Sequence, residues 1–224
     1  MTAPDLARSV DEARGHFARG ELGAARRACE RILAARPEQA DALQGLGLIA
    51  ARERRYAEAA GYFERVLAQA PAEVPVLLEL GTALLNAGRP AAAVEPLMRA
   101  ARLDSANAAV HFNLGNAYLG VGRCGEAARH FRIVLAMDGE VPPVLANLAT
   151  ALIGAGQPEE ALEACARATA AGGTSAGLEL LRGGALRAAG RRDEAAAAYR
   201  AALALAPRLE AASQGLADLE AAGA

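Results

Sequence analysis

The chain has 224 residues and a formal net charge of −2, so it lacks the positive field that attracts phosphate backbones or anionic lipid. Neither nucleic acid nor a membrane surface is therefore an expected partner. Hydrophobic side chains make up 53% of the sequence but aromatic ones only 4%, and much of the apolar content is alanine, the best helix former.

The first residues, MTAPDLARSVDEARG, contain no positively charged stretch followed by an apolar run, and nowhere do roughly 18 apolar residues occur together. We therefore expect a cytoplasmic protein. Its cysteines, Cys29, Cys124 and Cys165, are too few and too scattered for a disulfide framework, so reduced thiols are predicted.

An internal repeat organises the whole chain. One alanine recurs every 34 residues, at Ala25, Ala59, Ala93, Ala127, Ala161 and Ala195. A glycine keeps the same step at Gly88, Gly122, Gly156 and Gly190. This register predicts a domain at 1–209 with six repeats, which span 6–39, 40–73, 74–107, 108–141, 142–175 and 176–209.

Each repeat is expected to hold two helices. Pro75, Pro142 and Pro143 would open first helices, and Pro90 and Pro158 would open second helices, because a missing N–H costs nothing in a first turn. The eighth place of the repeat, where the two helices should cross, is small throughout: Ala13, Gly47, Gly81, Gly115, Ala149 and Gly183.

Three departures stand out from this pattern. Glu12 and Arg182 replace the leucine found at the seventh place of the other repeats, and Pro96 falls inside a second helix, where a kink is predicted. After the sixth repeat, 210–224 reads EAASQGLADLEAAGA, an amphipathic segment suited to cap the last apolar edge as a helix.

The period and the segments LGLIAARERRYAEAAGYFERVLAQAP and FNLGNAYLGVGRCGEAARHFRIVLAMD resemble the tetratricopeptide-repeat family. This resemblance implies an all-α fold, a right-handed superhelical α-solenoid of antiparallel helix pairs with a C-terminal capping helix. It also implies a concave groove lined by the first helix of each repeat.

The groove positions of that family fall here on polar and apolar side chains, which are therefore candidate peptide-binding residues: Asp41, Gln44, Glu79, Thr82, Asn86, Phe112, Asn113, Asn116, Asn147, Thr150 and Arg187. Asn113 and Asn147 resemble in part the asparagine ladder of the repeat domain of O-linked N-acetylglucosamine transferase, which grips extended peptide backbones. We expect both amides to face solvent in the empty groove. A solvated polar face without a ligand is the alternative interpretation.

Family members that clamp a terminal carboxylate use cations in the groove. The fifth place here holds no cation: Val10, Gln44, Leu78, Phe112, Ala146 and Leu180. That mode of binding is disfavoured.

The remaining motifs and reactive residues predict no catalytic, nucleotide-binding or metal site. Gly120, Gly122 and Gly125 spell GxGxxG, but the register places them at a turn between two helices rather than after a strand. Histidines occur singly, at His16, His111 and His130, without neighbours at metal-ligand spacing. We expect no catalytic residues, no metal and no cofactor. Cys29 and Cys165 are predicted to pack as small hydrophobes, and Cys124 to lie in a turn.

The leading hypothesis is a bacterial scaffold or adaptor that binds an extended segment of another protein in its groove, with self-association possible. The alternative is a substrate-recruiting region associated with a bacterial sulfotransferase or glycosyltransferase. An RNA-binding helical repeat is disfavoured, because that class would need a basic groove and has a different period.

Overall fold

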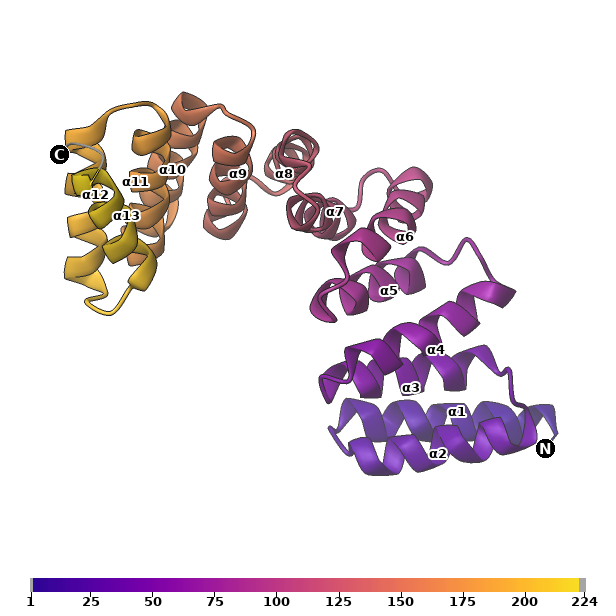
Figure 1. Ribbon diagram of the computed structural model, residues 1–224. Helices are drawn as coiled ribbons and strands as arrows, with labels where there is room; N and C mark the ends of the chain where they lie inside the picture. The colour runs from indigo at the N-terminus through magenta and orange to yellow at the C-terminus, as the bar shows by residue number, and fades with distance from the viewer. Residues whose placement is uncertain (1, 222–224) are drawn as a thin grey trace. The chain divides into compact units, whose positions relative to one another are not determined.

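The computed structural model describes residues 2–221, which form 13 α-helices and no strand. The helices are α1 (Ala3–Ala18), α2 (Leu22–Ala35), α3 (Ala40–Arg52), α4 (Tyr56–Gln69), α5 (Val74–Asn86), α6 (Pro90–Leu103), α7 (Ala108–Gly120), α8 (Cys124–Asp138), α9 (Pro142–Gly154), α10 (Pro158–Gly172), α11 (Ala176–Ala188), α12 (Arg192–Leu205) and α13 (Glu210–Ala221). The all-α prediction is confirmed, and successive helices pack as neighbouring hairpins (Figure 1).

The helices group into two compact units, one ending at Leu114 and the other beginning at Gly115. In the first unit, α1 and α2, α3 and α4, and α5 and α6 form stacked pairs. The second unit contains α8 to α13, in which α9 packs on α8, α10 and α11. Odd-numbered helices up to α11 are the first helices of the predicted repeats, and even-numbered helices are the second ones.

Glycines in the left-handed backbone region end the first helices. Gly88, Gly122, Gly156 and Gly190 have φ between 72° and 75°, a conformation that glycine adopts without steric cost. Arg54 occupies the same place in the second repeat with φ 60°, which is unfavourable for a residue that carries a β-carbon. The tight turn therefore does not strictly require glycine, although it favours it.

The predicted close crossing of the two helices within each repeat is present. A β-carbon placed on Gly47 would lie 2.6 Å from Phe63, and one placed on Gly183 would lie 2.5 Å from Tyr199. Where the eighth place is alanine instead, at Ala13 and Ala149, the residue 16 positions later is the smaller cysteine rather than leucine or an aromatic residue. Volume at the crossing is thus balanced between the two helices in every repeat.

Arginines link second helices to the loops before their own repeats. Arg65 of α4 donates to the carbonyl of Pro37 at 2.7 Å and pairs with Glu38 at 2.7 Å. Arg99 of α6 makes the equivalent bond to the carbonyl of Pro71 at 2.5 Å. The side chains of Arg65 and Glu38 are exposed, so their ion pair adds little free energy, but it links the loop to the helix.

Helix α13 covers the end of the second unit, as predicted for a capping helix. Ala212 and Leu219 are buried against Tyr199 and Leu186, and a β-carbon on Gly215 would lie 2.7 Å from Tyr199. Residues 222–224 of the predicted cap lie outside the described residues. Helix α6 continues through Pro96, and the kink expected there stays a prediction.

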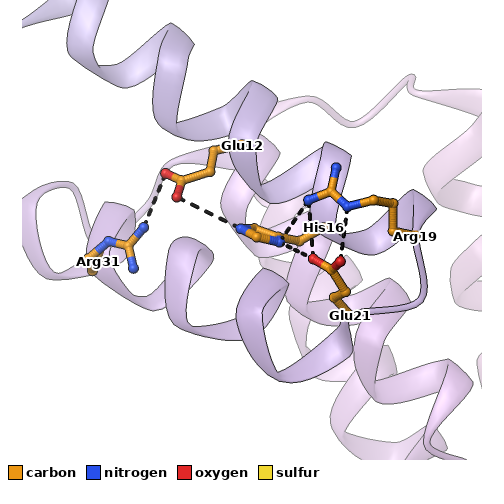
Figure 2. A network of polar contacts seen from close by, with 5 residues as sticks. All are labelled: Glu12, His16, Arg19, Glu21 and Arg31. Carbon is orange, nitrogen blue, oxygen red and sulfur yellow. Dashed lines mark hydrogen bonds and ion pairs between the residues drawn. The ribbon is translucent and has the colours of Figure 1, made fainter.

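A charged network joins the end of α1 to the start of α2 (Figure 2). Glu21 accepts a hydrogen bond from Arg19 Nε at 3.0 Å and lies 2.5 Å from Nδ1 of His16. Glu12 lies 3.2 Å from Arg31 and 3.8 Å from the other ring nitrogen of His16. The hydrogen bond from Arg19, followed by the contact with His16, lowers the pKa of Glu21 from 4.5 to about 2.

We expect this carboxylate to make stability depend on acid pH. Because its folded pKa is depressed, its contribution is fully present above about pH 4.5 and is lost as the pH falls towards about 2. Glu21→Gln should therefore flatten the fall in urea midpoint across that window. Glu30→Gln, a change at an exposed residue of α2 without an ion pair among the described residues, is the control. An equally steep fall in Glu21→Gln and the parent would contradict the assignment.

Candidate functional site

In the first unit, two candidate side chains from adjacent repeats contact each other. Gln44 Nε2 of α3 donates to Glu79 Oε2 of α5 at 3.3 Å. Glu79 is half-buried, and the loss of solvent around its carboxylate raises its pKa, while the bond from Gln44 opposes that rise. Asp41 is more exposed and accepts hydrogen bonds from Arg14 Nη2 at 2.7 Å and from Gln39 at 3.3 Å.

The other candidates of this unit make local contacts or lie at the surface. Thr82 Oγ1 donates to the Leu78 carbonyl at 2.8 Å, and Asn113 Nδ2 donates to the Ala109 carbonyl at 2.9 Å, so both are bonded within their own helices. Asn86 is exposed at the end of α5, and Phe112 is half-buried on α7.

In the second unit, the polar candidates form one contact between repeats and one with the cap. Asn147 Nδ2 of α9 donates to Asn116 Oδ1 of α7 at 3.1 Å. Thr150 is exposed and donates to the Ala146 carbonyl at 3.0 Å. Arg187 Nη1 lies 3.4 Å from Asp218 Oδ2 on α13, so this cation already forms an ion pair with the capping helix.

The amides of Asn113 and Asn147, which were expected to face solvent, are partly exposed and are also hydrogen-bonded within the protein. Each amide donates one hydrogen bond to a neighbouring protein group, and Asn147 pairs with Asn116 rather than pointing freely outward. The remaining acceptor and donor atoms of these half-buried side chains are the ones available to a ligand.

A pocket that sequence reasoning missed lies between α1 and α3. It has a volume of about 290 Å³, and it is lined by Val10, Ala13, Arg14, Phe17, Cys29, Ile32, Asp41, Ala42, Gln44, Gly45, Leu48 and Ile49. One signal in the sequence was Gly45, a glycine at the sixth place of a repeat where Glu79, Asn113 and Asn147 stand in others.

The glycine motif lies at a turn, as predicted. Gly120 ends α7, Gly122 has φ 75° in the turn, and Gly125 lies in the first turn of α8. No group of three or more metal-ligating residues occurs among the residues that the structure describes. Within the same part of the chain, no helix has the length and apolar character needed to cross a membrane.

Two of the three cysteines are buried in helix interfaces, as predicted. Burial raises the pKa of both Cys29 and Cys165, the latter to about 11, which keeps these thiols protonated near neutral pH. Cys124 is not in a turn, because it is the first residue of α8 and is half-buried against Gly154.

Solved structures with the same fold cover most of the chain. The crystal structure of YrrB, described as a TPR protein with an unusual peptide-binding site, superposes with a TM-score of 0.72 at 23% identity, over 76% of this chain and 88% of that one. The pilF structure from Pseudomonas aeruginosa gives 0.71 at 22% identity, over 95% and 97% of the chains. A MamA structure labelled AMB-1 gives 0.68 at 26% identity, over 75% and 92%.

No curated protein matches the chain. Tetratricopeptide-repeat family models match residues 10–74, 112–176 and 146–210, and a second model of the same description matches residues 50–111. These matches cover most of the sequence and agree with the 34-residue register and with the paired helices. The chain is therefore a member of the tetratricopeptide-repeat family.

Proposed function

We propose that the protein is a scaffold that holds an extended segment of a partner protein on the face formed by its first helices. The observation that carries this proposal is the recurrence of polar side chains from adjacent first helices that bond to each other, Gln44 to Glu79 in the first unit and Asn147 to Asn116 in the second. The YrrB structure, which shares the fold, is described as having a peptide-binding site, which supports the same class of function.

Such pairs suit a peptide backbone for a chemical reason. An asparagine side chain both donates and accepts hydrogen bonds, and a peptide unit in an extended segment offers one N–H and one C=O. A side-chain hydrogen bond contributes only about 0.5–1.5 kcal/mol net, so an existing Asn–Asn bond is exchanged for bonds to a peptide at small cost.

Binding of this kind depends more on the backbone of the partner peptide than on its amino-acid sequence. The part of the affinity that comes from Asn116 and Asn147 should depend weakly on salt, because these amides carry no net charge. Other candidates would contribute beside these pairs within their own units, Asn86 in the first and Thr150 in the second.

The test is the double variant Asn116→Ala with Asn147→Ala. The partner is first identified by mass spectrometry of proteins that co-purify with the full chain, and its affinity is then titrated. We expect the double variant to weaken binding by about 1–3 kcal/mol, because each lost amide leaves a peptide group unpaired. The variant should remain helical, since these half-buried side chains contribute only one bond to the fold.

Gln157→Ala is the matched control, because Gln157 is an exposed amide in the turn between α9 and α10, and within residues 2–221 its side chain bonds only to Glu160. Its affinity should equal that of the parent. Equal affinities for the double variant and the control would move the contact to another surface.

A further inference from the structure

The pocket between α1 and α3 exists because two small residues coincide. Gly45 stands where the third to fifth repeats carry Glu79, Asn113 and Asn147, so no side chain covers the opening. Cys29 stands where the second and fourth repeats carry Phe63 and Phe131, so the floor lies deeper than a phenyl ring would allow. A β-carbon on Gly45 would lie 2.8 Å from Cys29 Sγ, so even alanine would press against the floor of the pocket.

The interior of this pocket is apolar. Ala13, Cys29, Ile32, Ala42 and Ile49 are buried, and the aromatic ring of Phe17 and the side chain of Leu48 are partly buried beside them. At about 290 Å³ it lies at the lower limit of pockets that hold small-molecule ligands, which span roughly 300–1,000 Å³. This volume and lining fit one bulky aliphatic or aromatic side chain.

The rim of the pocket is polar and unevenly charged. Arg14 and Asp41 form an ion pair at 2.7 Å with side chains 68% and 39% exposed, so the pair is weak and readily rearranged. Asp11 lines an adjoining depression with the same Arg14 and Asp41, is exposed, and forms no ion pair within residues 2–221. This depression is thus lined by two carboxylates and one guanidinium.

A second cation lies beside the pocket residue Phe17. Arg52, the last residue of α3, lies over the ring of Phe17 with its guanidinium carbon 4.4 Å from the ring centroid. Asp41 is the second residue of the same helix, so the carboxylate rim and this cation lie at opposite ends of α3. A ligand with a positive charge on one side of its apolar group would match this arrangement in one direction only.

We propose that the pocket receives one bulky apolar side chain of the bound peptide, with a basic residue next to it facing Asp11 and Asp41. This inference rests on the proposed scaffold function and adds the sequence preference that the paired amides do not supply. Burial of such a side chain is expected to strengthen binding roughly tenfold or more.

The experiment is a selection from a displayed library of random peptides on the full chain, on Gly45→Leu and on Asp11→Arg. The parent should enrich peptides in which a leucine, methionine or phenylalanine neighbours an arginine or lysine. Gly45→Leu fills the opening and should lose the apolar preference. Asp11→Arg leaves the interior untouched and should shift the neighbouring preference from basic to acidic residues.

Two controls separate this site from the rest of the protein. Glu64→Arg changes an exposed charge on α4, away from the pocket lining, and should leave the enriched motif unchanged. Asn147→Ala lies in the second unit, outside the pocket lining, and the enriched peptides should keep the motif.

One selected peptide is then titrated together with its derivative in which alanine replaces the apolar residue. The derivative should bind the parent about tenfold or more weakly, and the two peptides should bind Gly45→Leu equally. Circular dichroism verifies that each variant is folded. If Gly45→Leu does not fold, the shift in preference expected for Asp11→Arg tests the pocket.

Failure of the pocket and failure of the scaffold give different results. The pocket assignment would be wrong if the parent enriched peptides that lack the apolar and basic pair. It would also be wrong if Gly45→Leu and Asp11→Arg both enriched the same pair as the parent. Either result would leave the scaffold function standing. A parent that enriches no peptide at all would overturn both.

Discussion

Gly115→Leu is expected to destabilise the second unit by about 1–3 kcal/mol or more, because overpacking a close helix crossing forces the helices apart. A β-carbon on Gly115 would lie 2.7 Å from Cε1 and 2.9 Å from Cζ of Phe131, which is fully buried. Because the ring is enclosed by the protein, we expect the strain to be met by separation of α7 and α8. The denaturant midpoint of the folded chain measures the effect.

Gly125→Leu provides the matched control in the same unit. No atom lies within 4 Å of a β-carbon placed there, and the residue is exposed in the first turn of α8. Because leucine is a better helix former than glycine, this change should be neutral or stabilising by up to about 1 kcal/mol. A larger loss in Gly125→Leu than in Gly115→Leu would contradict the repeat register.

A double-mutant cycle tests whether contact with Phe131 causes the loss of stability expected for Gly115→Leu. The pair Ala149 and Cys165 in the fifth repeat shows that alanine at the crossing goes with a smaller partner. Phe131→Cys should therefore cost less in a Gly115→Ala background than in the parent, with a coupling of about 0.5–3 kcal/mol.

Glu179→Leu is expected to stabilise the second unit by about 1–3 kcal/mol, because it removes a buried carboxylate oxygen that has no hydrogen-bond partner. Glu179 occupies the fourth place of its repeat, where Leu43, Leu77 and Leu145 are fully buried. Its nearest cation is Arg182 Nη1 at 3.7 Å, an ion pair too long to be a hydrogen bond. Leucine would restore the apolar contact between α10 and α11.

The exposed change Glu163→Leu on α10 is the control and should alter stability by no more than about 0.5 kcal/mol. Denaturant midpoints compare the two variants, and amide hydrogen exchange should show slower exchange in α11 of Glu179→Leu. If the midpoint of Glu179→Leu falls below that of the parent, the carboxylate has a stabilising partner and the argument from burial fails.

Much of the fold followed from the sequence because repeats carry their structure locally. The spacing of 34 residues between Ala25 and Ala59 predicted the position of every helix pair. Glycines such as Gly88, which the structure shows in the left-handed region, predicted the positions of the turns. The small residue at the eighth place, Gly115 for example, predicted the close crossing before any contact was known. Each of these features depends on residues within one 34-residue unit, where spacing along the chain and distance in space are closely linked.

The polar contacts between repeats could not be predicted in the same way. Asn113 and Asn147 hold equivalent places, yet Asn147 bonds to Asn116 and Asn113 bonds to its own helix. Arg187 was placed among peptide-binding residues, but Asp218 of the cap lies beside it. Which partner a flexible side chain selects depends on distances of about 3 Å between different helices, and sequence register leaves those distances open.

The sequence by itself determined the helix pairs, their order and the small residues at the crossings, because these follow from a strict period and from the size of single side chains. Only the tertiary structure decided the pocket between α1 and α3. That cavity requires Gly45 of one repeat and Cys29 of the preceding one to meet across two helices, with Arg14 and Asp41 at its rim. A void arises from the combined volumes of residues distant in sequence, so it becomes visible only when the packed helices are seen together.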